Sequence, residues 1–218
     1  INALLGEQKA ATDVLPLTNT VTRYELKAPG LPAKLTLLDT VGYGHAGVVA
    51  DQVERTAEVV QEVDLILLVT QARNPARQAD VAFLASLREW FAARPHLKFP
   101  PLIVILTHVD LLTPAMEWRP PYNWREPTRP KEIHMAEASK SAAEAFPTVS
   151  TLVPCCTAEG KCWAVAEDVQ PAIASHLADA KAVAFLRCLH AEADEGKIRR
   201  VFSQVWTAGK QLYQIARG

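Results

Sequence analysis

Residues 102–110 carry the sequence LIVILTHVD, five apolar residues followed by Thr107, His108, Val109 and Asp110. An apolar run of this length, rich in β-branched residues, predicts a buried strand that ends in a polar turn. Residues 34–39, KLTLLD, predict a second strand, which ends at Asp39. Strand and helix patterns alternate along the chain, and this alternation predicts an α/β protein with a largely parallel sheet flanked by helices.

The expected elements follow this alternation. Strands are predicted at residues 21–26, 34–39, 64–70, 102–107 and 148–154, the first two as a pair joined by a turn at Pro29-Gly30. Helices are predicted at residues 1–5, 48–62, 75–93, 131–145 and 165–177, with Pro75 as a favourable first helical residue.

Residues 113–130 interrupt the alternation. Five prolines and three large aromatic residues fall in this stretch. So many prolines exclude a regular helix or a central strand, and they predict a long insertion loop. Residues 179–218 have a helical pattern to the end of the chain. We therefore expect one α/β domain over residues 1–178 and a C-terminal helical extension over residues 179–218.

Composition narrows the class of protein. The net charge is −1, with 49% hydrophobic and 22% charged residues, which is typical of a soluble globular protein. Charge gives no support to a ribosomal or RNA partner, although it does not exclude one. No apolar run approaches the roughly 18 residues of a membrane span, so we expect no such segment and a cytoplasmic protein. The cysteine spacing fits neither a zinc ribbon nor a disulfide framework, which predicts reduced thiols at Cys155, Cys156, Cys162 and Cys188.

Two stretches have the pattern of a guanine site. Thr107-His108-Val109-Asp110 resembles the [NT]-K-x-D motif of GTPases, in which Asp110 would accept hydrogen bonds from N1 and N2 of guanine. His108 replaces the usual lysine, and its imidazole could stack on the base. Residues 152–158, LVPCCTA, resemble the last GTPase motif, with Cys156 and Thr157 in the place of Ser-Ala, where a backbone N–H reaches the guanine O6. The alternative is that each stretch is a strand that runs into an ordinary polar turn.

Two further stretches have the pattern of a phosphate and magnesium site. Asp39 follows a predicted buried strand, and it could hold magnesium through water. Gly42 would let a backbone N–H approach the terminal phosphate. Thr18, with Thr20 as second choice, would close on both magnesium and that phosphate. The alternative is that Asp39 and Gly42 belong to a common turn, and that the threonines are loop hydroxyls.

Taken together, the order Thr18, Asp39, Gly42, Asp110, Thr157 resembles the P-loop GTPases of the TrmE–Era–EngA–YihA–Septin-like superfamily, and within it the 50S ribosome-binding GTPase-like domains. In that family the loop G-x-x-x-x-G-K-[ST] precedes the segment that resembles residues 1–6, INALLG, and this motif does not occur in the sequence. We therefore expect the chain to start after this loop and after the first strand. Strands 34–39 and 64–70 would then lack a shared neighbour.

The resemblance implies a bacterial, GTP- and GDP-binding regulatory GTP hydrolase that uses magnesium, and a chain that alone is weak or inactive. Tyr43 stands where Ras-like enzymes keep a water-orienting glutamine, so the catalytic group is unknown and slow turnover is expected. The alternative is a degenerate GTPase-like scaffold without hydrolysis. A protein partner could bind the C-terminal helices or residues 113–130.

Overall fold

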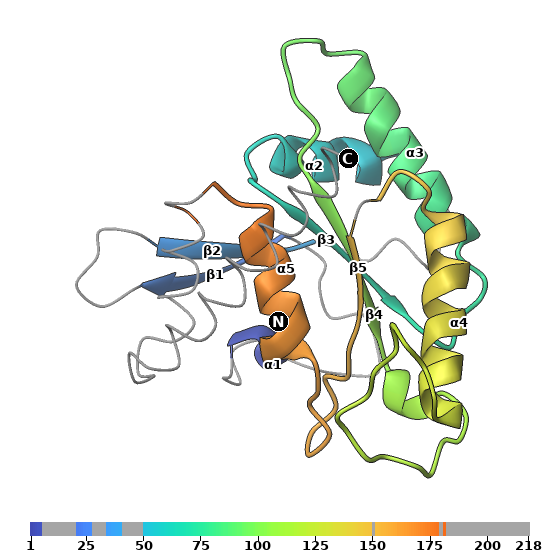
Figure 1. The fold of residues 1–218 in the computed structure, drawn as a ribbon. Helices are drawn as coiled ribbons and strands as arrows, with labels where there is room; N and C mark the ends of the chain where they lie inside the picture. The colour runs from blue at the N-terminus through green and yellow to red at the C-terminus, as the bar shows by residue number, and fades with distance from the viewer. Residues whose placement is uncertain (6–20, 28–33, 41–49, 150, 179–180, 182–218) are drawn as a thin grey trace, which may run out of the picture.

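A computed structural model describes residues 1–5, 21–27, 34–40, 50–149, 151–178 and 181. Its strands form two sheets (Figure 1). Strands β1 (Thr22–Lys27) and β2 (Lys34–Asp39) make an antiparallel pair, as predicted. Strands β3 (Ile66–Gln71), β4 (Leu102–Thr107) and β5 (Thr151–Pro154) make a parallel sheet in the order β3-β4-β5. Among the described residues, no ladder joins the two sheets.

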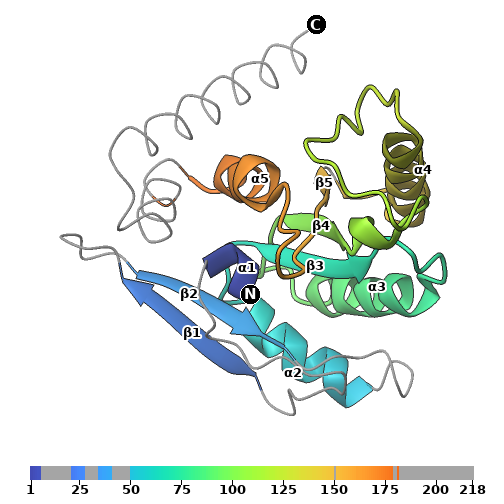
Figure 2. The ribbon, with the colours of Figure 1, turned by 90° about the horizontal axis from the view of Figure 1, so that it is seen from below.

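Helices cover both faces of the parallel sheet. The helices in chain order are α1 (Asn2–Leu5), α2 (Ala50–Val60), α3 (Gln78–Ala92), the 3-10 helix η1 (Val109–Leu111), α4 (Pro130–Ala145), the π-helix η2 (Val165–Val169) and α5 (Gln170–Ser175). One core cluster joins β3, β4, α3 and α4, and another joins β4, β5, α1 and α5. Figure 2 shows these two pairs of helices on opposite sides of the sheet. The predicted α/β fold is confirmed.

Strand β4 is the centre of this arrangement. Every one of its residues is buried. Val104 and Leu106 pack toward α3 and α4, and Ile103 and Ile105 pack toward α1 and α5. Successive side chains of a strand point to opposite faces, so a strand covered on both faces is apolar throughout. This explains why residues 102–106 show no alternation of apolar and polar residues.

Several boundaries differ from the predicted ones. Helix α3 starts at Gln78 rather than Pro75, because the Asn74 side chain accepts a hydrogen bond from the Ala76 N–H (3.0 Å) and forms a turn there. The strand predicted at 148–154 starts at Thr151, and the helix predicted at 165–177 starts with the π-helical turn η2. Strand β3 covers Ile66–Gln71 rather than 64–70.

Residues 113–129 form no named helix or strand, as the prolines predicted. The turn predicted at Pro29-Gly30 and nearly all of the predicted C-terminal extension lie outside the described residues. Within the described part of the chain, no helix is long and apolar enough to cross a membrane.

Candidate functional site

The predicted base-binding residues lie at one edge of the parallel sheet. Thr107 ends β4, Asp110 lies in η1 directly after it, and Cys156 follows β5. Strands β4 and β5 are parallel neighbours, and the Cys155 N–H donates to the Leu106 carbonyl (2.8 Å). The carboxyl ends of parallel strands meet at the same edge of a sheet, where open α/β folds bind ligands. The structure therefore brings the two predicted guanine motifs together.

Asp110 is the central acidic group at this edge. It is only 4% exposed. Its Oδ2 atom lies 3.3 Å from the Lys161 ammonium nitrogen. Its Oδ1 atom is buried and has no hydrogen-bond partner in the described structure. Buried carboxylate oxygens nearly always have a donor, because an unmade hydrogen bond costs roughly 1–3 kcal/mol or more. Asp110 thus keeps an unsatisfied acceptor within the site.

The residues before Asp110 turn the chain sharply. His108 is exposed and adopts a left-handed conformation (φ 60°, ψ 33°), which is uncommon outside glycine and often found at functional sites. The Thr107 hydroxyl donates to the Thr70 carbonyl of β3 (3.2 Å) and lies 2.9 Å from His108 Nδ1. Thr107 therefore has a structural role between strands, while the His108 ring is the one that solvent or a ligand can reach.

The loop after β5 forms the other wall of the site. Cys156 and Trp163 exchange backbone hydrogen bonds (3.1 and 3.0 Å), which closes a turn that contains Gly160 at φ 69°. Because the Cys156 N–H is donated to Trp163, it is not available for a base. Thr157, the other residue predicted here, is exposed.

The Cys156 thiol packs beside Asp110. Burial is the main reason that the pKa of Cys156 is raised to about 11, and the neighbouring Asp110 carboxylate adds to the shift. Backbone N–H groups of Ala158 and Asp110 oppose it. Cys156 therefore stays a neutral thiol near pH 7, and its S–H is placed to donate to the Asp110 carboxylate.

Two charged residues at the start of α4 organise the insertion, and nothing in the sequence pattern singled them out. Lys131 is completely buried, and its ammonium donates to the carbonyl groups of Asp110 (2.6 Å), Leu112 (2.8 Å) and Pro114 (3.0 Å). Burial lowers the pKa of Lys131, and the Asp110 charge partly opposes this. Lys131 thus holds together the chain segment that follows Asp110.

Glu132 holds the other end of the insertion. Its carboxylate accepts from the backbone N–H groups of Asn123 (2.8 Å), Thr128 (3.0 Å) and Arg129 (2.9 Å), and from the Arg129 guanidinium (2.7 and 2.9 Å). The Arg129 side chain and these backbone donors hold the pKa of Glu132 far below its ordinary value of 4.5. The proline-rich segment is therefore fixed by two adjacent buried charges.

An aromatic cluster joins the insertion to the loop after β5. The Trp163 ring lies edge-on to Tyr122 (5.5 Å between centroids) and to Trp118 (6.3 Å), and Trp118 and Tyr122 contact each other (5.3 Å). Arg129 covers the Tyr122 ring at 4.5 Å. The insertion therefore packs directly against the loop that carries Cys156 and Thr157.

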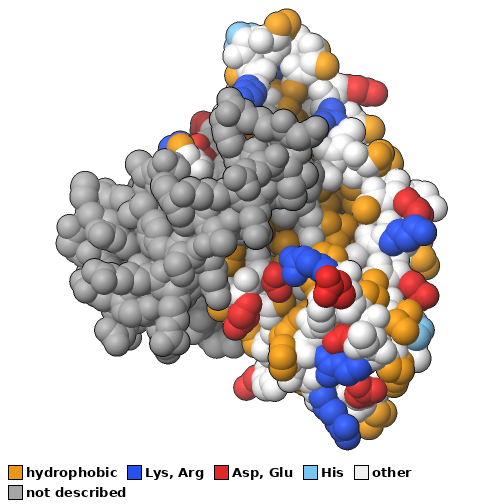
Figure 3. All heavy atoms as spheres, viewed as in Figure 1, with side chains coloured by type: hydrophobic (Ala, Val, Ile, Leu, Met, Phe, Trp, Pro, Cys, Tyr) orange, Lys and Arg blue, Asp and Glu red, His pale blue; other side chains and the backbone are white. Residues whose placement is uncertain are grey.

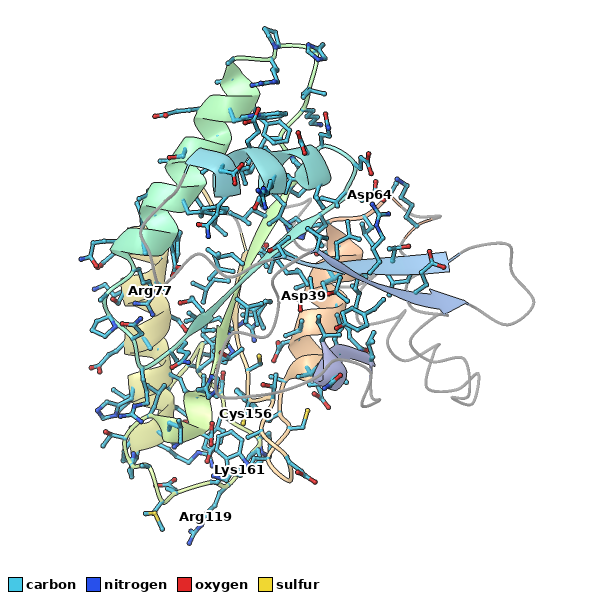
Figure 4. The ribbon with its side chains drawn as sticks, turned by 180° about the vertical axis from the view of Figure 1, so that it is seen from behind. Asp39, Asp64, Arg77, Arg119, Cys156 and Lys161 are labelled. Atoms are coloured by element: carbon cyan, nitrogen blue, oxygen red, sulfur yellow. The ribbon has the colours of Figure 1, made fainter. Side chains whose placement is uncertain are left out.

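The predicted phosphate-binding residues are placed only in part. Asp39 is the last residue of β2 and is half-buried. Figure 4 shows it on the β1–β2 pair, whereas Cys156 and Lys161 lie together at the loops after β5. Thr18 and Gly42, and with them Thr20 and Tyr43, lie outside the described residues. Within the described ranges, no group of three or more His, Cys, Asp or Glu side chains is arranged to hold a metal.

Comparison with known proteins identifies the class. Residues 1–107 match the family described as 50S ribosome-binding GTPase. The chain is also similar to tRNA modification GTPases MnmE from three bacteria. The identity is 33% over 92 residues for Laribacter hongkongensis (41% of this chain, 20% of the relative). It is 32% over 118 residues for Coxiella burnetii (53% and 24%) and 39% over 83 residues for Streptococcus sanguinis (37% and 18%).

The parallel sheet, with its polar residues at the carboxyl edge, and these similarities define a P-loop GTPase fold. The match over residues 1–107 and these relatives support a P-loop GTPase of the TrmE–Era–EngA family, and the predicted family is confirmed. The chain spans about a fifth to a quarter of the length of these relatives. The family match ends at Thr107, so the placement of Asp110 and Thr157 rests on the structure described above.

Proposed function

We propose that this protein binds GTP and GDP, reads the guanine base with Asp110, and acts as a regulatory GTP hydrolase. The observation that carries the proposal is the buried Asp110 Oδ1 atom, which has no partner among the described residues. Guanine presents two donors side by side, N1–H and the N2 amino group, and these match the two oxygens of one carboxylate. Adenine presents an acceptor at N1, so it would leave the buried carboxylate unpaired.

The other predicted residues complete this site. His108 is exposed beside Asp110, and its ring would lie along the base. Thr107 would fix the strand end through Thr70, and Thr157, after the packed Cys156 thiol, would direct a backbone N–H toward the guanine O6. These roles follow from the positions of the residues at the carboxyl ends of β4 and β5.

Lys161 sets a condition on base binding. It is paired with Asp110 Oδ2, yet 43% of its side chain is exposed. Guanine would therefore either share Oδ2 with Lys161 or displace the lysine from it. The lysine side of this pair is open to solvent, so Lys161 can move away from Asp110 when a base that carries its own donors binds the carboxylate.

The roles of the phosphate-binding residues are inferred from the resemblance to the family. Thr18 and Asp39, the latter through water, would hold magnesium, which neutralises phosphate charge, and the Gly42 N–H would contact the terminal phosphate. In hydrolysis, water attacks the γ-phosphorus and the bond to the β–γ bridging oxygen breaks, which releases GDP and phosphate. Such catalysis depends mainly on the positioning of the phosphates and on neutralisation of their charge. The residues around Asp110, which we call the base end of the site, would hold the guanine base, and the residues around Asp39, the phosphate end, would hold the phosphates and magnesium.

We further propose that residues 1–178 form the nucleotide domain and 179–218 a helical extension, in a cytoplasmic protein. The insertion at 113–130 or the extension would bind a protein partner. Basic and acidic side chains of the described residues are interspersed on the face shown in Figure 3, which gives an RNA partner no particular support.

A second candidate function, a scaffold that binds no nucleotide, is favoured by one observation. The Lys161–Asp110 pair satisfies one oxygen of the carboxylate without any ligand. Magnesium-dependent binding of fluorescent GTP, together with release of inorganic phosphate, separates the two functions. It should be measured on this chain and on a form that carries any natural upstream sequence. Binding by either form supports the GTPase, and no binding by both forms supports the scaffold.

A further inference from the structure

A buried lysine beside the proposed base site has no role in the function described so far. Lys131 is the second residue of α4 and is 0% exposed. Lysine is almost never fully buried unless it is paired. No carboxylate in the described part of the chain lies within 4.0 Å of its ammonium group, and its three hydrogen bonds all go to backbone carbonyls. Such a desolvated cation is costly, so its position requires a reason.

The three carbonyl groups belong to one short segment. They are those of Asp110, Leu112 and Pro114, alternate residues of the chain just after β4. The shortest of the three bonds, 2.6 Å, goes to the carbonyl of Asp110 itself. Within the segment, the Leu111 and Leu112 N–H groups donate to His108 and Val109 (3.1 and 3.2 Å). The backbone of Asp110 is therefore fixed by its own 3-10 turn on one side and by Lys131 on the other.

The insertion keeps Lys131 in place. Glu132, the next residue, binds the backbone of residues 123–129, and the Trp118 ring lies 5.7 Å from the Lys131 ammonium nitrogen. A cation near an aromatic face is attracted to it, more strongly when water is excluded. The lysine therefore sits in a cage of carbonyl groups and one aromatic ring, and it has little freedom to move.

We propose that Lys131 is a positioning residue for base recognition: it holds the Asp110 carboxylate in the orientation that pairs with both N1–H and N2–H of guanine. The inference rests on the proposed function. It makes the 113–130 insertion part of the specificity machinery, because that segment carries one of the three carbonyl groups, that of Pro114, and the Trp118 ring beside the lysine.

The test compares GDP with IDP, which lacks the 2-amino group of guanine. The variant Lys131→Met removes the ammonium group at nearly constant volume, and Lys140→Met, an exposed lysine on the same helix, is the matched control. The ratio of the two dissociation constants does not depend on the fraction of folded protein. We expect Lys131→Met to lower the preference for GDP over IDP about tenfold, the value of one hydrogen bond to a charged group. Lys140→Met should leave it unchanged.

Lys131→Arg provides the conservative variant, and it keeps the test decisive if Lys131→Met does not fold. A guanidinium can still donate to the same carbonyl groups, so it should recover most of the preference. An unchanged GDP-to-IDP ratio in the folded Lys131 variants, with only a lower melting temperature, would show a purely structural lysine and overturn the inference. Wild-type protein that binds GDP and IDP equally would overturn it as well, while leaving nucleotide binding itself intact. Wild-type protein that binds neither nucleotide would instead refute the proposed function, and this inference with it.

Discussion

The two carboxylates of the proposed site follow or end strands that differ sharply in burial: Asp110 lies in the turn after β4, and Asp39 is the last residue of β2. All six residues of β4 are buried, whereas residues 35–39 of β2 are all half-buried. Strand β4 lies between β3 and β5 under helices on both faces, and β2 pairs with β1 alone among the described strands. Asp110 is therefore held by a packed core and a buried lysine, and Asp39 ends a half-buried pair of strands. The described residues include Thr107, His108, Asp110, Cys156 and Thr157 of the proposed base-binding part and Asp39 of the proposed phosphate-binding part.

The largest expected effect comes from exchanging each carboxylate for its amide. Asp110→Asn places an N–H where guanine also presents donors, so we expect GDP binding to weaken about 100-fold or more. Asp39→Asn should instead weaken the dependence on magnesium and leave the preference for guanine over adenine unchanged. Titration calorimetry with GDP and ADP, with and without magnesium, measures both effects.

Asp64→Asn is the control for this pair, since Asp64 is exposed and pairs only with Lys181 in the described structure. Asp64→Asn should change neither the affinity for GDP nor the dependence of binding on magnesium. Equal losses of guanine preference in the Asp110 and Asp39 variants would contradict the division into a base end and a phosphate end.

The next effect concerns the stability of the base end. Glu132→Gln breaks the carboxylate network of the insertion and leaves donors of three residues poorly paired. We expect a loss of about 3 kcal/mol in the free energy of unfolding at pH 7, as for a broken buried ion pair. Urea denaturation measures it. Glu137→Gln, exposed on the same helix, should cost less than about 0.5 kcal/mol.

The same network predicts a pH dependence. The folded-state pKa of Glu132 lies below its ordinary value of 4.5, so its stabilisation is complete above that pH and is lost as the pH falls below it. The wild type should therefore lose stability between pH 5 and pH 3 more steeply than Glu132→Gln. If the free energy of unfolding fell equally steeply with pH in the two proteins, the Glu132 carboxylate would not have the lowered pKa that its hydrogen bonds predict.

The smallest expected effect concerns cysteine reactivity. Cys162 is exposed, whereas burial raises the pKa of Cys155 to about 12 and of Cys156 to about 11. Only thiolates react rapidly, so of the three cysteines in the described part of the chain iodoacetamide should label Cys162 first and the buried pair far more slowly. Cys188 lies outside the described residues. Trp163→Ala, which removes the aromatic contact over this loop, should speed labelling of Cys156. Peptide mass spectrometry distinguishes the sites, and equal rates in the wild type would contradict the packing of this loop.

The sequence predicted those parts of the molecule that depend on periodicity. The apolar run at 102–106 indicated a buried strand, and the strand-to-polar-turn pattern located Asp110 at its end. Prolines correctly predicted an irregular segment over 113–129, whereas Pro130, the last residue of the predicted loop, is the first residue of α4. Lys131 and Glu132 were missed because charged residues in the first turn of a helix are usually exposed, and nothing in local spacing shows that an insertion will cover them. Lys161 was missed for the same reason, since its partner Asp110 is 51 residues away.

The central claim is that the carboxyl end of β4 reads guanine through Asp110. The most direct test is displacement of a fluorescent guanine nucleotide from the wild-type protein by unlabelled GDP, IDP and ADP. We expect GDP to displace it most strongly, IDP less strongly because one donor to Asp110 is missing, and ADP least. Equal displacement by GDP and ADP would contradict it, and Asp110 would then be a buried structural carboxylate paired with Lys161.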